Sequence, residues 1–482
     1  MGRMTMMRTS KRGPASTARL RQVVIISVMC LALYCFLLVP DHSLDSSRSS
    51  MLETFPRPQA KPESESAEEL PQALLNNRLL TSSQCRATFP GLTKEIDDVV
   101  AKGPFTLIRN PHGLGPTVAR IRSGQLSILT YARKADLSKD MLQHRSATLH
   151  QIAAALLTTP PSEPVPDTII AFNHEDDPKS HTLSYARPAD PSLNGPAKRF
   201  FPIPHFSFYS WPIRTVVSQA RAAAAISRIE TATNPHSTWA SKPARAIWRG
   251  TPWFNNPRLA HLRSDLVLLA RDKPWADIEA LLPNNSNALP IEDFCRYRYI
   301  VHTEGVTYSG RLQYHQQCGS VVLAPPIAWM QHLTHLVKPV FSAALQLEGS
   351  ARSAPPDASF ARGGGSSQPK KPAPYPAPWA LAAWPTSHDP STEANMVFVA
   401  PDWTDLEPTI AWLEQHPDTA AAIARRQRDL FSGRGYFSPA AEACYWRALL
   451  RGWSQVVDTE GQGYEELEEV PWEEFSLTEV HK

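Results

Sequence analysis

The second half of the chain alternates short apolar runs with segments of helical periodicity. The apolar runs predict strands at residues 246–248, 299–301, 321–323 and 397–399. The segments between and after them predict helices at residues 258–269, 309–317, 327–336, 405–415, 417–431 and 438–456. Alternation of this kind is typical of a parallel sheet with helices on both faces. We therefore predict an α/β protein with a doubly wound sheet.

The composition allows a sizeable folded core and argues against nucleic acid as a partner. Of 482 residues, 42% are hydrophobic and 20% are charged, which excludes a wholly disordered chain and allows two or three domains. The formal net charge is only +3, so no field of one sign covers the molecule. Upstream of residue 244, the spacing predicts helices at 137–157 and 215–229 and a buried strand at 168–172.

Residues 23–39 form an unbroken run of uncharged, mostly apolar residues. As a helix the run would span about 26 Å, which is enough for a thin bilayer. Six basic residues and no acid precede it, at Arg3, Arg8, Lys11, Arg12, Arg19 and Arg21. By the positive-inside rule, residues 1–22 form a cytoplasmic tail and the remainder is lumenal. We predict a single-pass type II protein anchored in the Golgi or ER bilayer; a cleaved signal peptide is the alternative.

Composition also divides the lumenal part of the chain. Residues 40–79 are rich in Ser, Pro and Glu and predict a flexible stem. An N-terminal lobe at 80–240 and a C-terminal lobe at 241–457 follow. Within the latter, residues 341–393 are rich in Gly, Ser, Ala and Pro, and this low-complexity insertion is either a disordered loop or a gene-model error. The acidic end, 458–482, predicts a solvated tail.

The cysteines fit an oxidising compartment. Cys30 and Cys35 fall inside the apolar run, and four others lie beyond it, at Cys85, Cys295, Cys318 and Cys444. An even number of lumenal cysteines permits two disulfides, and spacing alone leaves three possible pairings. One sequon, beginning at Asn284, predicts a site of N-glycosylation.

The segment 304–311 has the features of an anion-binding site. A strand is predicted to end at about His302, Gly305 permits a tight turn, and Ser309 is a good N-cap for the next helix. Free backbone N–H groups and the helix dipole at such a terminus favour phosphate. Arg311 in the first turn would add a bidentate contact. The alternative is that Ser309 only caps the helix and Arg311 is a surface residue.

Two further segments follow predicted strands. Residues 247–251 end one strand, with Arg249, Gly250 and Thr251 at its carboxyl end and Arg258 opening the next helix. Ligands of open α/β sheets bind at such ends. Asp176 and Asp177 follow the strand at 168–172, where either could act as a general base. A turn explains the same acids equally well.

Several motifs of other enzyme classes are missing from the sequence. It contains no Asp-x-Asp, no His-Glu-x-x-His and no Gly-x-Ser-x-Gly. Their absence argues against a metal-dependent sugar transferase, a zinc protease and an α/β-hydrolase, respectively.

Taken in order, the blocks of this chain resemble one enzyme family. The blocks are Pro166-Asp167, Asn173, Asp176, Pro178, 206–212, 248–250, Tyr297, Tyr299, Glu304-Gly305, Ser309, Arg311, 319–323, 405–406 and 444–446. Their order and spacing are similar to those of the fungal capsule-associated (CAP-ten domain) glycosyltransferases, which are related to the animal Rumi-like protein O-glucosyltransferases. The likeness covers about 80–460 and is interrupted by the insertion.

The resemblance implies a fold, a reaction and two partners. The fold is two Rossmann-like lobes in the GT-B arrangement, with the acceptor on the N-terminal lobe and the donor on the C-terminal one. The reaction is inverting transfer of a sugar, xylose or glucose, from a UDP-sugar to a hydroxyl of a glycan or glycoprotein. No cofactor and no metal are expected. The chain ends at Lys482 without an ER-retention signal and carries an anchor instead, which favours the fungal, Golgi-like branch.

The resemblance also implies roles for single residues. Asp176 corresponds to the catalytic base, with Asp177 as the fallback. Thr251 matches a donor-binding Ser, Arg258 is offset by one residue from a donor-binding Arg, and Ser309 with Arg311 matches a diphosphate-binding Ser-x-Arg. The implied donor-binding residues are Arg249, Gly250, Thr251, Arg258, Glu304, Ser309, Gly310 and Arg311. The implied disulfides are Cys295–Cys318 and Cys85–Cys444.

Two other functions remain open at this point. The first is a catalytically inactive, membrane-anchored sugar-binding protein on the same fold, disabled by the insertion at 341–393. The second is a glycoside hydrolase, which would need two carboxylates about 5–9 Å apart; no second acid is evident beside the pair Asp176 and Asp177.

Overall fold

The structure, a computed structural model, describes residues 70–110, 115–231, 238–347 and 375–479. All of them belong to one compact unit, Glu65–Lys482. In this part of the chain no helix combines the length and the apolar character needed to cross a bilayer. The predicted cytoplasmic tail (1–22), the anchor (23–39) and residues 40–69 of the predicted stem lie outside the described residues. The end of the predicted stem is not flexible, because residues 72–75 form a helix that buries Leu75 in the core.

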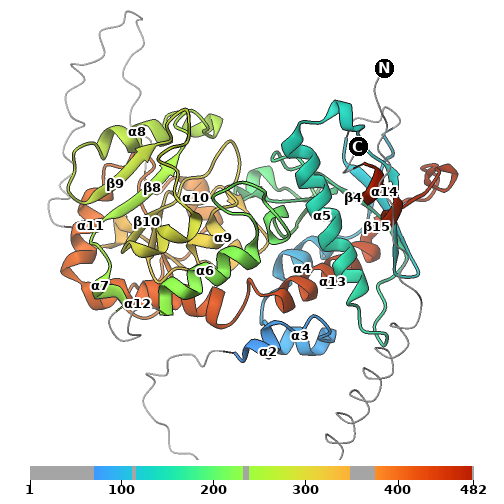
Figure 1. Cartoon of the computed structure of the whole chain (residues 1–482), viewed down its shortest axis with the longest axis horizontal. Coiled ribbons are helices and arrows are strands. Elements are labelled where there is room, and N and C mark those ends of the chain that lie inside the picture. The colour runs from blue at the N-terminus through green and yellow to red at the C-terminus, as the bar shows by residue number, and fades with distance from the viewer. Residues whose placement is uncertain (1–69, 111–114, 232–237, 348–374, 480–482) are drawn as a thin grey trace, which may run out of the picture. The chain divides into compact units, whose positions relative to one another are not determined.

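One of the two large sheets is wholly parallel, as predicted (Figure 1). Its strand order is β13-β14-β11-β10-β8-β9, and every neighbouring pair is parallel. The strands are β8 (Ala246–Gly250), β9 (Ala276–Ala280), β10 (Tyr299–Val301), β11 (Val321–Ala324), β13 (Pro339–Phe341) and β14 (Met396–Phe398). The sequence predicted four of them and missed β9 and β13.

This sheet is buried on both faces, which is why its strands read as continuous apolar runs. One core contains Trp248 and Tyr299, and the other contains Ile247 and Ile300. The first core is closed by α8 (Leu262–Leu269), α11 (Leu406–Gln415) and α12 (Pro417–Arg428). The second is closed mainly by α6 (Gln219–Thr231) and α10 (Pro378–Ala383).

The other large sheet is mixed, so the Rossmann-like expectation does not hold for all of it. Its strand order is β16-β3-β2-β4-β5-β7. The strands are β2 (Thr117–Arg122), β3 (Gln125–Thr130), β4 (Thr168–Phe172), β5 (Thr182–Ser184), β7 (Phe200–Pro202) and β16 (Val470–Pro471). β4, β5 and β7 are parallel, whereas β2 pairs antiparallel with β3 and β4. Ser123 and Gly124 join β2 to β3 with positive φ angles of 50° and 76°, and so short a connection permits only an antiparallel pair.

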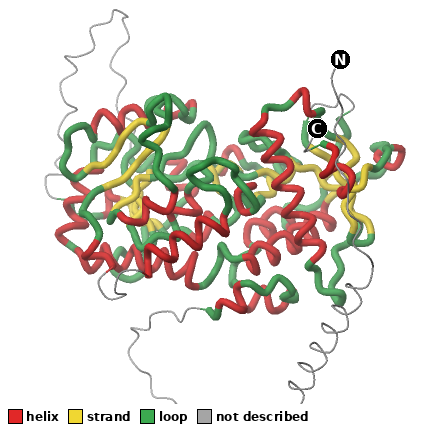
Figure 2. Tube along the Cα trace, viewed as in Figure 1, coloured by secondary structure: helices red, strands yellow, loops and turns green. Residues whose placement is uncertain are grey.

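The long helix α13 (Pro439–Val456) packs in the core of this mixed sheet, although its sequence position places it in the predicted C-terminal lobe (Figures 1 and 2). It contacts α4 (Lys94–Val100), α5 (Lys139–Leu157), α3 (Ser82–Thr88) and α2 (Gln72–Leu75). The indole of Trp453 donates to the main-chain oxygen of Ile169 at 2.8 Å. A disulfide joins Cys85 to Cys444 with a Cα–Cα distance of 5.7 Å. The chain therefore returns to its first sheet after completing the second.

The second disulfide links Cys295 to Cys318, with a Cα–Cα distance of 4.9 Å. Both implied pairings are thus confirmed. The helix expected at 309–317 is shorter than predicted. Its α-helical part is the single turn α9 (Leu312–His315), and tighter turns precede and follow it between Ser309 and Cys318. Arg311 stands at its N-cap, and Ser309 does not cap it.

The helix expected at 327–336 is also wrong. The chain instead forms β12 (Trp329–Met330), which pairs antiparallel with β6 (Arg187–Pro188), and then a short 3-10 turn at Thr334–Leu336. The carboxylate of Glu304 accepts the main-chain N–H groups of Ala328 and Trp329 at 3.1 and 2.9 Å. Because these two N–H groups donate to a side chain, they are not available for helical hydrogen bonds, and the segment is extended.

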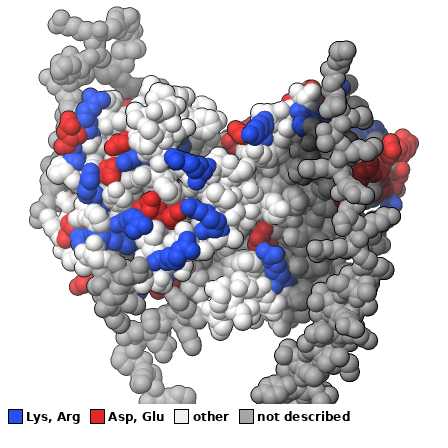
Figure 3. Space-filling model, in the orientation of Figure 1, with Lys and Arg blue, Asp and Glu red and all other residues white. Residues whose placement is uncertain are grey.

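The acidic end of the chain is folded onto the mixed sheet, which corrects the solvated-tail interpretation. β15 (Val457–Asp458) pairs with β1 (Phe105–Thr106), and β16 adds an edge strand beside β3. Arg120 forms an ion pair with Glu465 at 3.2 Å and a second with Glu469. α14 (Trp472–Thr478) then buries Phe475. Figure 3 shows acidic side chains gathered where Figure 1 places this segment.

The flanks of the low-complexity insertion are part of the parallel sheet. β13 ends at Phe341, and α10 lies within the predicted insertion. The indole of Trp384 donates to the main-chain oxygen of Ile327 at 3.1 Å, and the Tyr375 hydroxyl donates to that of Phe398 at 2.7 Å. Residues 341–347 and 375–393 are therefore not a structureless loop. Residues 348–374 lie outside the described residues.

Candidate functional site

The parallel sheet has a topological switch point between β8 and β10. From β8 the chain moves to β9 on one side, and then returns to β10 on the other side of β8. Ligands of open α/β sheets bind where the strand order reverses in this way, beyond the carboxyl ends of the strands. A cavity of about 650 Å³ lies there, between the segments that follow β8 and β10 and the loop that follows β4.

The cavity brings together most of the predicted site residues. Its lining includes Asp176, Arg249, Gly250, Thr251, Ser309, Gly310 and Arg311. Asp177 does not line it, and neither do Arg258 and Glu304. The Arg258 side chain is 55% exposed and lies 3.4 Å from an Asp190 carboxylate oxygen. Glu304 holds β12 instead, and burial raises the pKa of its carboxyl to about 8.

Two arginines, the buried Arg263 and the partly buried Arg311, line the cavity without an acidic partner among the described residues. Arg311 donates to the main-chain oxygen of Arg249. Arg263, from α8, donates to the main-chain oxygens of Glu304 and Thr251 at 3.1 and 3.2 Å. Burial lowers the pKa of Arg311 to about 10 and that of Arg263 to about 9, the latter also because Arg311 is close. Two such cations on one cavity favour a bound anion.

Arg249 differs from this pair because its charge is already neutralised. Its Nη2 atom lies 2.6 Å from Oδ1 of Asp277, and its Nη1 atom donates to the main-chain oxygen of the same residue at 2.7 Å. The Tyr297 hydroxyl donates to the other carboxylate oxygen of Asp277. Arg249 therefore acts mainly as part of the wall of the cavity.

Asp176 also lines the cavity and comes from the loop after β4. The Tyr308 hydroxyl donates to Oδ1 of Asp176 at 3.1 Å, and the Thr307 hydroxyl donates to its main-chain oxygen at 2.9 Å. The amide of Asn173 donates to the main-chain oxygen of Asp177 at 2.6 Å. This bond closes the turn and leaves Asp177 off the cavity, so the structure distinguishes two acids that the sequence could not.

The lining residues that the sequence analysis did not propose include Asp140, His144, Arg263 and Tyr308. Asp140 and His144 come from α5, four positions apart, so they share one face of that helix. His144 stacks on Phe206 with 3.6 Å between ring centroids, and burial lowers the pKa of its imidazole. The i, i+4 spacing was the only sequence signal for this pair. Arg263 lies inside the helix predicted at 258–269, and the sequence analysis assigned Arg258, at the start of that helix, to the donor instead.

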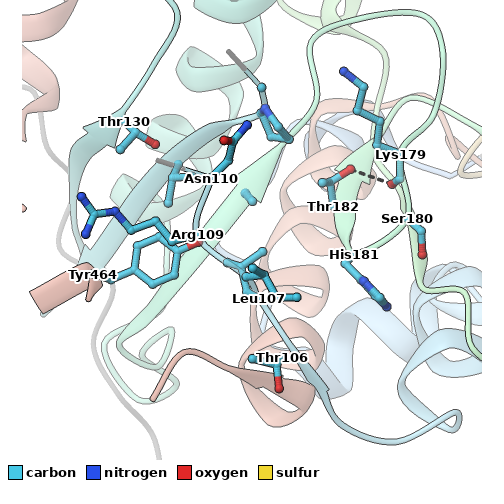
Figure 4. Close-up of a pocket in the computed structure, with 15 residues that line it drawn as sticks. Thr106, Leu107, Arg109, Asn110, Thr130, Lys179, Ser180, His181, Thr182 and Tyr464 are labelled. Carbon is cyan, nitrogen blue, oxygen red and sulfur yellow. Dashed lines mark hydrogen bonds between the residues drawn. The ribbon is translucent and has the colours of Figure 1, made fainter. Parts of the chain in front are cut away.

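A second, smaller hollow of about 290 Å³ lies on the mixed sheet and contains none of the predicted site residues. Figure 4 shows Arg109, Asn110, Thr130 and Tyr464 along one part of it and Lys179–Thr182 along another. The Arg109 guanidinium donates to the main-chain oxygen of Gly463 at 2.9 Å, and Lys179 forms an ion pair with Glu175. The charged groups of Arg109 and Lys179 in this hollow are therefore already bonded to other groups of the protein. The cavity at the switch point is the candidate active site.

Gly310 is at a position where no side chain fits. A Cβ there would lie 2.5 Å from Cε1 of His205, whose ring is held by a 2.7 Å contact between its Nδ1 and Ser207 Oγ. We expect Gly310→Ala to displace Arg311, reduce the affinity of the cavity for an anionic ligand by about tenfold and lower the free energy of unfolding by about 1–3 kcal/mol. Calorimetric titration and denaturant unfolding would measure both effects. Gly195→Ala, where nothing lies within 4 Å, should change neither.

The stability of the fold should have a maximum near pH 7. Burial lowers the pKa of several imidazoles, most strongly at His174, His205, His302, His315 and His332. These groups take up protons mainly in the unfolded chain, so stability falls as pH drops below about 6.5. Burial raises the pKa of Glu304 to about 8 and that of Glu442 to about 7, so folding holds their protons and stability falls as pH rises through 7 and 8.

Urea unfolding at pH 5, 7 and 9 would measure this profile. His332→Gln should reduce the acid-side slope by up to one proton, because its ring is fully buried and its pKa lies at about 3. A free energy of unfolding that rises steadily from pH 7 to 9 would contradict the assignment of the two glutamates.

The sequence matches the model of glycosyl transferase family 90 over residues 126–342. This stretch includes the loop after β4, the whole of the segment 304–311 and the first strands of the parallel sheet. The comparison with curated proteins found no match. An α/β fold, a cavity at its switch point and this match together define a glycosyltransferase. The chain is a glycosyltransferase enzyme, as predicted, and it requires a sugar donor and an acceptor. The relationship to Rumi-like enzymes stays a prediction.

Proposed function

We propose that this glycosyltransferase transfers xylose or glucose from a UDP-sugar to a hydroxyl of a glycan or glycoprotein, with inversion at the anomeric carbon. The observation that carries the proposal is that one cavity is lined both by the carboxylate of Asp176 and by two arginines without an acidic partner among the described residues, Arg263 and Arg311. A diphosphate fits the cations, and a sugar between them and Asp176 would present its anomeric carbon to an acceptor. The two sheets would act as the lobes of a GT-B enzyme.

In this reaction Asp176 is the base. Its carboxylate takes the proton of the acceptor hydroxyl while that oxygen forms a bond to the anomeric carbon. The bond from the anomeric carbon to the β-phosphate oxygen breaks, and its electron pair stays on UDP. Arg311 and Arg263 stabilise the charge that develops there. The two guanidinium groups supply positive charge at the diphosphate, so no metal ion and no cofactor enter the proposed steps.

The cellular setting of the proposal rests on the sequence. Residues 23–39 would anchor the chain in a Golgi or ER bilayer as a type II protein, with the catalytic part in the lumen. Two disulfides agree with an oxidising compartment. Asn284, the proposed site of N-glycosylation, lies in an exposed loop. Nucleic acid is not among the proposed partners.

The second candidate function is an inactive sugar-binding protein on the same fold. The full-length protein in detergent, incubated with EDTA and each of UDP-xylose, UDP-glucose, UDP-galactose and UDP-N-acetylglucosamine, separates the two. Release of UDP from one donor would support the transferase and name its sugar. Binding of UDP without release would support the binding protein, and neither binding nor release would contradict both.

A matched deletion tests the insertion. Because Phe341, Tyr375 and Trp384 contribute to the core, only residues 348–374 should be removed. Activity that appears only after this deletion would show that the insertion disables the enzyme. Equal activity before and after it would show that the enzyme tolerates the segment.

A further inference from the structure

The loop that follows β10 reaches across the cavity and holds the proposed base. Tyr308 donates to the Asp176 carboxylate at 3.1 Å, and Thr307 donates to its main-chain oxygen at 2.9 Å. These bonds join residues 132 and 131 positions apart in the sequence. The next residues along the same loop are Ser309, Gly310 and Arg311, which line the side of the cavity proposed for the donor.

We propose that Tyr308 and Thr307 are positioning residues that hold Asp176 in place from the donor-binding loop. The inference rests on the proposed function and adds a coupling to it. Tyr308 occupies Oδ1 of the carboxylate, so Oδ2 is left to accept the proton of the acceptor hydroxyl. A donor that orders Arg311 therefore also orders the atoms that hold the base, three residues earlier on the same loop.

The loop is rigid enough to transmit such an effect. The main-chain N–H of Gly305 lies 3.0 Å from the main-chain oxygen of Thr307 and 3.3 Å from that of Tyr308, which closes a tight turn. The Tyr308 side chain is buried, with its ring 5.6 Å from that of His205 and 6.1 Å from that of Tyr185. A phenol fixed in this way can place its hydroxyl on one carboxylate oxygen only.

Other ionisable groups face Asp176, and they determine how a pH profile is interpreted. They are His144 and Asp140 of α5, Tyr185 after β5, Tyr308, and the neighbours Glu175, Asp177 and Lys179 on its own loop. Glu175 and Lys179 neutralise each other in an ion pair. Burial lowers the pKa of His144 and raises that of Tyr185 and Tyr308, so these three stay neutral at pH 7.

The test is the pH dependence of kcat/KM for Tyr308→Phe. It is measured on the full-length protein with the donor from which the wild type releases UDP. Loss of the donated hydrogen bond leaves the ionised carboxylate less stabilised. The acid limb should move up by roughly 0.5–1 pH unit, with kcat about tenfold lower and KM for the donor within about twofold. Thr307→Val should lower kcat without moving the acid limb, because it releases the main chain and not the carboxylate.

Tyr314→Phe is the matched control. Tyr314 is also buried, but its hydroxyl lies 2.9 Å from Ser207 Oγ and does not contact Asp176. Its removal should reduce the melting temperature and leave the pH profile unchanged. UDP binding and a thermal melt of each variant would show that it is folded.

Three outcomes would overturn the inference while leaving the proposed function intact. One is an active wild type with an unchanged pH profile and an unchanged kcat in Tyr308→Phe. Another is a lower kcat with no movement of the acid limb, which would make Tyr308 merely structural. The third is the same shift in Tyr314→Phe. A wild type that releases no UDP from any donor would instead refute the proposed function itself.

Discussion

Asp176→Asn should reduce sugar transfer by about three orders of magnitude and leave UDP binding within about twofold of wild type. The amide keeps the shape of the side chain and can still accept from Tyr308, but it cannot take the proton of the acceptor hydroxyl. General-base catalysis contributes about 10²- to 10⁴-fold in enzymes. Initial rates of UDP release with acceptor, and calorimetric titration with UDP, would measure the two quantities.

Asp177→Asn is the control for this experiment. Asp177 is adjacent in sequence and exposed, but it does not line the cavity. The rate of sugar transfer by Asp177→Asn should therefore stay within about threefold of wild type. A greater loss in Asp177→Asn than in Asp176→Asn would reverse the assignment of the base. Asp140→Asn serves a second purpose, because Asp140 also lines the cavity. A hydrolase with two catalytic carboxylates would lose activity equally in both variants, whereas the transferase should lose it mainly at Asp176.

Arg311→Met and Arg263→Met should each weaken UDP binding roughly 10- to 100-fold without destabilising the unliganded protein. Each removes a buried guanidinium that would bind a phosphate oxygen, and such charged hydrogen bonds contribute about 1.5–3 kcal/mol. Burial disfavours the charge at both positions, as the lowered pKa values of about 10 and about 9 indicate. Folding therefore carries an electrostatic cost below pH 9, which methionine removes. Methionine also removes the hydrogen bonds from the two guanidinium groups to main-chain oxygens, so the two effects oppose each other and the melting temperature without ligand should change little.

Two other arginines provide the contrast. Arg249→Met should lower the melting temperature, because it leaves the carboxylate of Asp277 without its 2.6 Å ion pair. Arg258→Met should change neither stability nor UDP affinity by more than about twofold, because its side chain is 55% exposed and outside the cavity. Thermal melts with and without UDP would rank all four variants. Equal effects at Arg258 and Arg263 would contradict the separation that the cavity makes between them.

The sequence predicted the parts of the fold that depend on local periodicity. The strands that begin at Tyr299 and Val321 are apolar at every position, and the strand that begins at Ala246 is apolar as far as Trp248, because they are buried on both faces. The long helices α5 and α13 were found for the same kind of reason, since their apolar spacing is regular over many turns. The failure at 327–336 is a segment in which the Glu304 carboxyl group accepts two main-chain N–H groups and the chain forms a strand. The helix expected at 309–317 is shortened to one α-helical turn between tighter turns.

The sequence by itself also determined where the chemistry would gather, because the loops after β4, β8 and β10 follow buried strands and carry the polar residues. Only the tertiary structure decided which side chains meet. It selected Asp176 over Asp177, replaced Arg258 by Arg263 at the cavity, and brought Tyr308 to the carboxylate of Asp176. These choices depend on how two sheets face each other across a cavity. Residues more than 100 positions apart then come within hydrogen-bond distance, and no local spacing in the sequence encodes such a contact.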